Sequence, residues 1–247
     1  MVAKLKILKS VELSNPILIA GFPGAGNVAK LAVDNIIFST KAQLFAKIYN
    51  YGAPAKVFIF EDGTCEPLSF SIYFARGDRD LVIATGYAQP ESPEDQYDIS
   101  EKILELGKSM GCKRIYSFGA YIVDREVEEP RVFGTATSTE LVSMLKNNGV
   151  ITMNAGFITG MNGVIFALAP ILNMEGICLL GESLGYYADG KAAKRVLEVF
   201  SKLTDISIDY SLLDKVIAEV SRSLERLRKE EERMREYKKP SKLGYIS

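Results

Sequence analysis

Three stretches of the sequence carry residue types that could do chemistry. Residues 24–29, Gly-Ala-Gly-Asn-Val-Ala, fit the glycine fingerprint of a dinucleotide-binding turn, in which the backbone closely approaches a pyrophosphate. Residues 181–185, Gly-Glu-Ser-Leu-Gly, fit the elbow that presents a nucleophilic serine in many hydrolases. Acids gather around Ser92 within residues 91–98, and paired carboxylates can transfer protons or bind a hard cation.

Each stretch lacks a part that its chemistry needs. A dinucleotide turn requires an acid about 20 residues later to hold the ribose, and residues 44–52 contain none. A serine elbow requires a general base, and histidine, the usual one, is absent from the chain. The acids around Ser92 are typical of a helix start, where carboxylates face the positive end of the helix dipole. We therefore expect structural roles for all three stretches, with a partner contact as a further role for the glycine-rich turn.

The composition excludes further classes of function. Without histidine, the chain has no Ser-His-Asp or Cys-His catalytic system and no histidine-containing zinc site. Lys and Arg number 30 and Asp and Glu number 31, so the net charge of −1 gives no field that attracts nucleic acid or anionic lipid. We expect a protein that is not an enzyme and that binds no cofactor, metal ion, nucleic acid or membrane.

The remaining composition indicates the compartment. Cys65, Cys112 and Cys178 are isolated from one another, and an odd number without a CxxC motif argues against a disulfide framework. The chain has no signal-peptide pattern at its start and no apolar run of about 18 residues. We expect a cytoplasmic protein, and the low number of glutamines fits a thermophile.

The residues that could do chemistry are spread over an alternation of strands and helices. We expect strands at 16–20, 44–49, 57–60, 68–74, 81–85, 115–118 and 177–180, and helices at 28–37, 92–111, 137–149, 163–172 and 191–203. Such alternation predicts an α/β core domain over residues 1–208, with a central mixed, largely parallel sheet flanked by helices. The hairpin-like block from 55 to 85 indicates some antiparallel pairing.

The last forty residues differ in kind from the rest. A capping box at 211–214 and an apolar stripe from Leu212 to Leu227 predict a long charged helix within residues 209–239. From 225 to 239, 12 of 15 residues are charged, with Glu225/Lys229 and Glu231/Arg235 as favourable pairs. Because this half cannot pack on its own core, it must project into solvent or lie along another subunit. Its candidate contact residues are Leu224, Leu227, Met234 and Tyr237.

Pro240 ends the predicted helix and leaves a flexible tail over residues 240–247. The tail is either a disordered terminus or a short peptide that docks in a partner's pocket. Its candidate partner-binding residues are Leu243, Tyr245, Ile246 and Ser247, the last of which carries the terminal carboxylate.

The ordered set of short motifs resembles the archaeal branch of the proteasome-assembly-chaperone family. The motifs are Gly21-Phe22-Pro23-Gly24-Ala25-Gly26-Asn27-Val28-Ala29, Gly86-Tyr87-Ala88-Gln89-Pro90, Gly119-Ala120, Pro130-Arg131-Val132 and Gly160-Met161-Asn162-Gly163. Their order and spacing cover about residues 10–205. The resemblance implies an α/β fold like that of nucleoside phosphorylases without their active site. It also implies no catalysis, self-association and contact with proteasome core-particle subunits. Gly21, Phe22, Pro23, Gly24, Gly26 and Asn27 form the family's signature turn.

The end of the chain departs from that family's pattern. Some relatives end in a hydrophobic residue, a tyrosine and any third residue, which dock between subunits of the proteasome α-ring. Here the end is Gly244-Tyr245-Ile246-Ser247, so the tyrosine stands one residue early and the carboxylate is displaced by about 3.3 Å. A second chaperone homologue is therefore an alternative partner to the core-particle subunits.

Together these features predict a non-enzymatic, homo-oligomeric chaperone or scaffold related to proteasome assembly. We expect a ring-like oligomer that binds protein partners through the C-terminal helix and tail. The alternative is a nucleotide- or nucleoside-binding enzyme or sensor that uses the turn from Gly21 to Asn27, because the helix start that follows would suit a phosphate.

Overall fold

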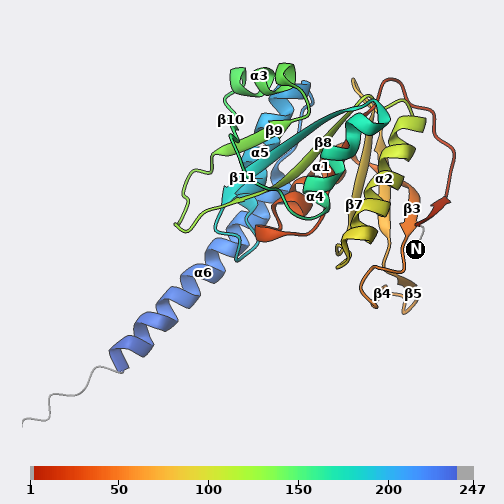
Figure 1. The fold of residues 1–247 in the computed structure, drawn as a ribbon. Helices are drawn as coiled ribbons and strands as arrows, with labels where there is room; N and C mark the ends of the chain where they lie inside the picture. Colours follow the sequence, from red (N-terminus) through yellow and green to blue (C-terminus); the bar gives the residue numbers. More distant parts are fainter. Residues whose placement is uncertain (1–2, 238–247) are drawn as a thin grey trace, which may run out of the picture.

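A mixed sheet forms the centre of the molecule. The computed structural model describes residues 3–237, and the side chains of residues 3–234. Within these residues nine strands join in the order β1-β3-β6-β7-β2-β8-β11-β9-β10 (Figure 1). Their bounds are β1 Lys4–Ile7, β2 Ile17–Gly21, β3 Gln43–Tyr49, β6 Phe70–Ala75, β7 Leu81–Gly86, β8 Arg114–Ile122, β9 Val132–Ala136, β10 Ile151–Thr152 and β11 Glu175–Ser183. The central strands β7, β2, β8 and β11 run parallel, and antiparallel pairs flank them.

Helices cover both faces of this sheet. The helices are α1 (Val28–Thr40), α2 (Pro93–Ser109), α3 (Thr139–Asn147), α4 (Met161–Leu168), α5 (Gly190–Thr204) and α6 (Ser211–Tyr237). One apolar core lies between the sheet and α2 and α4, and a second lies between the sheet and α1, α3, α5 and the start of α6. Because the central strands are covered on both faces, β2 and β7 are buried along their whole lengths. The predicted α/β fold, a central mixed sheet flanked by helices, is confirmed.

The helix starts follow the polar residues that the sequence offers. The side chain of Ser92 accepts a hydrogen bond from the backbone N–H of Asp95 at 3.1 Å, and that of Ser138 accepts one from Leu141 at 3.3 Å. These contacts begin α2 and α3 at the predicted positions. The predicted helix over 163–172 instead begins at Met161 and changes to a short 3-10 helix at Ala169–Leu172, where Pro170 has no N–H to donate.

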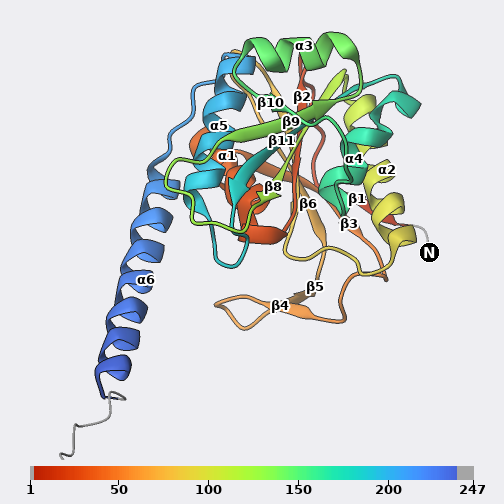
Figure 2. The same ribbon diagram turned by 60° about the vertical axis from the view of Figure 1, so that its left-hand side comes forward.

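The antiparallel block from 55 to 85 divides into two parts. Strand β6 joins the main sheet, whereas β4 (Val57–Ile59) and β5 (Cys65–Pro67) form a separate hairpin. Both α6 and this hairpin extend from the lower end of the body in Figures 1 and 2.

The C-terminal helix contacts the body from its start as far as Arg228. Leu213 is buried in the second core, and its N–H donates to the side chain of Asn35. Further along, Arg228 pairs with Glu126 at 2.7 Å. The later part of the helix projects from the body (Figure 2), and Leu227 and Met234 are 55% and 68% exposed. The predicted pair Glu225/Lys229 forms at 2.9 Å, whereas Glu231/Arg235 involves a side chain outside the described residues.

The start of α6 corrects one detail of the sequence interpretation. The expected capping box places Ser211 as the cap and Asp214 as its reciprocal partner. In the structure Asp209 accepts the hydrogen bond from the Ser211 N–H at 2.9 Å, and the Asp214 N–H donates to the carbonyl of Tyr210. The exposed side chain of Asp214 instead forms an ion pair with Lys194 of α5, at 2.7 Å.

We predict that Gly21→Ala destabilises the fold by about 1–3 kcal/mol, the usual cost of overpacking a core. A Cβ at residue 21 would lie 2.5 Å from the carbonyl oxygen of Ala29 and 2.5 Å from a methyl group of Val33, so α1 would be pushed off the sheet. Urea unfolding measures the change. Gly77→Ala, whose Cβ would meet nothing closer than 3.8 Å, is the control, and equal stabilities of the two variants would contradict the prediction.

Candidate functional site

The carboxyl ends of the parallel strands meet at one edge of the sheet, and the family motifs predicted from the sequence converge there. The signature turn, residues 21–27, follows β2 and leads into α1. Gly26 and Asn27 adopt the left-handed conformation, with φ of 58° and 51°. Glycine adopts such a φ without strain, and asparagine tolerates it better than most residues do. The turn therefore reverses the chain within a few residues and aims α1 back across the sheet.

Asn162 holds the signature turn from the opposite side. The N–H of Phe22 donates to the Asn162 side-chain oxygen at 2.9 Å, and the Asn162 amide donates to the Phe22 carbonyl at 3.1 Å. Gln89 acts in the same way, because its amide donates to the Pro23 carbonyl and its oxygen accepts from the N–H of Met161. The motifs around residues 86–90 and 160–163 thus supply the hydrogen-bonding partners of the turn.

The loop between β11 and α5 closes over the other side of the turn. The N–H of Gly26 donates to the carbonyl of Gly185 at 2.9 Å, and the N–H of Asp189 donates to the carbonyl of Gly26 at 2.8 Å. A phosphate at the start of α1 would have to accept from the N–H groups there. Those of Gly26, Asn27 and Val28 donate to the carbonyls of Gly185, Gly24 and Ala25. Because they are already paired within the chain, the geometry favours a structural role for the turn over the nucleotide-binding alternative.

Ser183, the serine of the elbow-like motif, is buried. Its hydroxyl donates to the Asp189 carboxylate at 2.7 Å and accepts from the N–H of Gly185 at 3.1 Å. A Cβ on Gly26 would lie 2.8 Å from this hydroxyl. The serine therefore packs under the signature turn and fixes the neighbouring loop, which agrees with its expected structural role.

Glu182 forms an ion cluster next to that serine. Its carboxylate is 1% exposed and accepts from Arg131 at 2.7 and 2.9 Å and from Arg125 at 2.5 Å. Hydrogen bonds from the Arg131 side chain, with the positive charge of Arg125, lower the pKa of Glu182 from 4.5 to about 2. The guanidinium of Arg131 also lies 5.3 Å from the centre of the Phe133 ring. This cluster anchors the charged loop 124–131, whose sequence is as typical of a contact surface as of a solvated loop.

The loops at this edge enclose a cleft of about 420 Å³. Its walls come from the signature turn, the end of β8 and the loop 153–160, and they combine apolar side chains with those of Gln89, Thr159 and Asn162. Phe157 at its mouth is 97% exposed, Ile122 is more than half exposed, and Tyr186 on the neighbouring loop is 90% exposed. Sequence reasoning missed these residues. The available signal was an aromatic residue beside a glycine in a loop, Gly156-Phe157 and Gly185-Tyr186.

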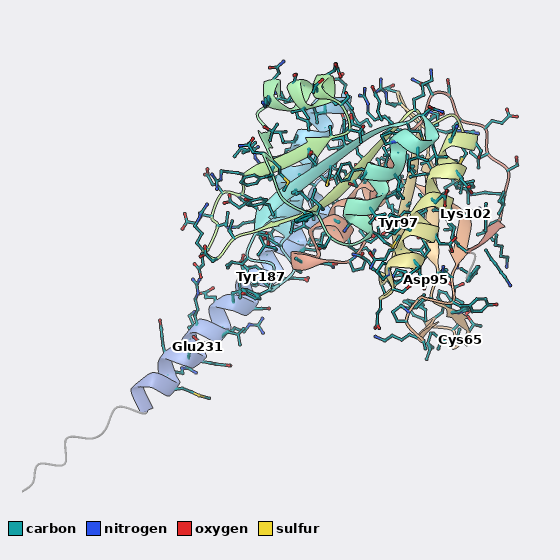
Figure 3. All side chains as sticks on the ribbon, viewed as in Figure 1. Cys65, Asp95, Tyr97, Lys102, Tyr187 and Glu231 are labelled. Atoms are coloured by element: carbon teal, nitrogen blue, oxygen red, sulfur yellow. The ribbon has the colours of Figure 1, made fainter. Side chains whose placement is uncertain are left out.

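The other candidate residues fall outside this edge. The acids around Ser92 serve the helix start: Asp95 bonds to Ser92, and Asp98 accepts from Asn50 and from the N–H of Ala3. Figure 3 shows Asp95 on α2, Tyr187 where α6 meets the body and Glu231 on its projecting part. No group of three or more metal-ligating side chains occurs among the described residues, and none of the described helices is long and apolar enough to cross a membrane.

The candidate residues on α6 differ in their surroundings. Leu224 is half-buried against the loops at the base of the helix, whereas Leu227 and Met234 are exposed. Tyr237 is the last residue of α6, and its side chain lies outside the described part. The tail residues Leu243, Tyr245, Ile246 and Ser247 also lie outside the described residues.

The sequence pattern of the PAC2 family matches residues 18–228. The chain belongs to the PAC2 family. An uncharacterized protein from Methanocaldococcus jannaschii is 34% identical over 229 residues, which cover 92% of this chain and 89% of that protein. These matches confirm the predicted family, and the relatives are archaeal, as expected.

Solved structures of other proteins share the fold of this PAC2 protein. Pyrococcus furiosus PbaB, described as an archaeal proteasome activator, superposes with a TM-score of 0.86 at 30% identity, covering 92% of this chain and 99% of PbaB. Pyrococcus furiosus PbaA, described as an archaeal homolog of proteasome-assembly chaperone, superposes with a TM-score of 0.79 at 25% identity, covering 96% of each chain.

We predict that Glu182→Gln lowers stability at pH 7 by about 1–3 kcal/mol, because the hydrogen bonds to Arg131 and Arg125 lose their charge. The folded-state pKa of about 2 lies below the unfolded value near 4.5. The carboxylate therefore stabilises the fold above pH 4.5, and this contribution is lost as the pH falls from 4.5 towards 2.

Thermal unfolding between pH 7 and pH 2 tests this expectation. The melting temperature of the parent chain should fall more steeply over that acid range than that of the Glu182→Gln variant. Glu175→Gln, which removes an exposed pair with Arg114, is the control and should change stability by no more than about 0.5 kcal/mol. Parallel pH profiles for the parent and Glu182→Gln chains would show that the cluster has no such effect.

Proposed function

We propose that this PAC2 protein is a non-enzymatic, homo-oligomeric chaperone or scaffold of the cytoplasm, related to proteasome assembly, that binds protein partners through α6 and the tail. The observation that carries the proposal is the apolar stripe of α6, in which Leu227 stands next to Arg228, whose side chain still contacts the body, and Met234 lies beyond that contact. Within the described residues, Leu227 and Met234 lie on that stripe and are exposed. A stripe of this kind is covered when helices from several copies associate.

The spacing of the stripe is that of a coiled coil. Its positions are Leu213, Ile217, Val220, Leu224, Leu227, Glu231 and Met234, which alternate steps of four and three residues. A mean spacing of 3.5 residues keeps one seam facing a partner helix along a left-handed supercoil. The first positions pack on the body of the same chain, and the later ones remain for a neighbouring subunit. Glu231 places one charged residue in the seam, a device that can fix the register of the helices.

The charges beside the seam favour a parallel arrangement. With Leu227 and Met234 at d positions, Glu230 occupies a g position and Arg235 the following e position. In parallel helices the g residue of one chain faces that e residue of its neighbour, so opposite charges meet. A parallel bundle of identical helices has cyclic symmetry, which agrees with the ring-like oligomer expected from the sequence. All tails would then emerge at one end of the assembly.

The likeness to PbaB and PbaA supports the choice of partner. Because the descriptions of those proteins name a proteasome activator and a proteasome-assembly chaperone homologue, we extend contact with core-particle subunits to this chain. A second chaperone homologue is the alternative, given the displaced Tyr245. Several tails at one end would bind a multi-subunit target with avidity, so each single contact need only be weak.

We predict that Leu227→Glu breaks the oligomer, because it places a charge in the exposed part of the seam. Native mass spectrometry should then give a folded monomer in place of a defined oligomer. Arg226→Glu changes a charge at a heptad position outside the seam and should leave the oligomer intact. An unchanged subunit number in Leu227→Glu would remove α6 from the interface. Leu213 is left untouched, since it belongs to the core.

We predict that the full-length protein binds the proteasome core particle or its free α-subunits, and that a chain ending at Lys239 loses at least tenfold in affinity. The tail residues Leu243, Tyr245 and Ile246 would supply the lost contact. Native mass spectrometry of the mixtures reports both binding and subunit number. Undiminished binding by the shortened chain would exclude the tail, and a defined oligomer that ignores both targets would point to a second chaperone homologue as the partner.

A further inference from the structure

The cleft at the carboxyl edge opens where two neighbouring strands separate. Strands β2 and β8 pair as far as Ala20 and Ser117. Beyond them β2 enters the signature turn, where the N–H of Phe22 donates to Asn162, and β8 continues to Ile122 without β2 beside it. The chain runs from β2 toward β3 on one side of the sheet and from β8 toward β9 on the other. Open α/β sheets bind their ligands at such a switch point, outside the carboxyl ends of the strands.

The edge of β8 that faces this gap carries unpaired backbone groups. Just after β8, the N–H of Val123 donates to the carbonyl of Ser183 on β11 at 3.0 Å. Successive residues of a strand direct their backbone groups to opposite edges, so the N–H and carbonyl of Ala120 and of Ile122 point away from β11, toward the gap. No hydrogen bond from the described part of the chain reaches these groups there. Both residues line the cleft.

These backbone groups define what a ligand must supply. The N–H of Ala120 requires an acceptor and its carbonyl requires a donor, and both groups point to the same side of the strand. A ring in which a carbonyl and an N–H stand on adjacent atoms, as in a cyclic amide, meets both requirements at once. A few fixed polar groups of this kind set the orientation of a ligand in a small-molecule pocket.

The other walls of the cleft suit an uncharged, flat ligand. None of the described residues that line it has a charged side chain. A phosphate or carboxylate placed there would lose water without gaining an opposite charge. Ile158 and Leu180 supply apolar contacts, and Gly24 and Gly160 leave room because they have no side chains. The volume of about 420 Å³ is that of a small-molecule pocket.

We infer that this cleft binds an uncharged planar cyclic amide, the chemistry of a pyridone ring or of a nucleobase without phosphate. The carbonyl of the ligand accepts from the N–H of Ala120, and its N–H donates to the Ala120 carbonyl. The ring lies against the apolar walls. This site goes beyond the proposed function, because it needs neither an oligomer nor a protein partner, so either proposal can fail without the other.

Two matched probes test the hydrogen bonds of the site. 2-Quinolone is a flat cyclic amide, and 1-methyl-2-quinolone keeps its ring and carbonyl but has no N–H. Ligand-observed NMR titration of the full-length protein measures both affinities. We expect 2-quinolone to bind with a millimolar or lower dissociation constant. The methylated probe should bind at least tenfold more weakly, because it leaves the Ala120 carbonyl without a donor.

A variant that fills the cleft tests the location of the site. Gly24 has an extended backbone, with φ of −168°, and a Cβ there would meet nothing closer than 3.8 Å. Gly24→Leu should therefore fold and lower the affinity for 2-quinolone at least tenfold. Gly77→Leu is the control, since its Cβ would also meet nothing closer than 3.8 Å and residue 77 lies between β6 and β7, at the opposite edge of the sheet. It should leave the affinity unchanged.

Amide hydrogen exchange of the parent chain gives a readout that does not depend on a variant. In the free protein the N–H of Ala120 should exchange faster than that of Tyr121, which faces β11, and 2-quinolone should slow it. The inference is overturned if 2-quinolone does not bind at millimolar concentration, if both probes bind equally, or if Gly24→Leu binds as the parent does. Slow exchange of the Ala120 N–H in the free protein would also overturn it.

Discussion

The arrangement of the carboxyl edge depends on the hydrogen bonding of one buried residue, Phe22. Its ring is fully buried, so its N–H and carbonyl have no access to water and require partners within the protein. Asn162 satisfies both groups with one side chain, as an adjacent strand would. Because Asn162 stands at the start of α4, this pairing joins the signature turn after β2 to a helix 140 residues later in the chain. This pairing fixes the signature turn and the start of α4 relative to each other, and both line the cleft.

A second chain of contacts connects the sheet to the projecting helix. Glu182 at the end of β11 holds Arg125 and Arg131, and the loop that carries these arginines places Glu126 against Arg228. The buried carboxylate of Glu182 is held by two arginines, whereas the exposed pair of Glu126 with Arg228 is weak, because surface ion pairs contribute about 0–1 kcal/mol. The base of α6 is therefore fixed by the core around Leu213, and its direction is only weakly guided further along.

The sequence predicts best those features that local chemistry decides. The polar caps Ser92 and Ser138 and the apolar runs of β2 and β7 identify their elements, because capping and burial act within a few residues. Strands β1, β5, β9 and β10 were missed. Strand β1 is exposed throughout, β5 has three residues and β10 has two, so none of these three shows the expected pattern. The pairing of Asn162 with Phe22 joins residues 140 positions apart, and no local rule connects them. The resemblance named these motifs, and the structure gives the physical reason for them.

Under the association proposed for α6, two requirements act on the helix at once, and its composition reflects both. The helix must remain helical and soluble before it associates, and Glu, Lys and Arg meet that need as good helix formers that pair along one face, as Glu225 and Lys229 do. It must also carry a seam strong enough to hold copies together once they meet. Leu224, Leu227 and Met234 provide that seam, and Glu231 interrupts it. A continuous apolar seam would bind tightly in any register, whereas an interrupted one trades affinity for a single alignment, which is what an assembly that presents its tails at one end requires.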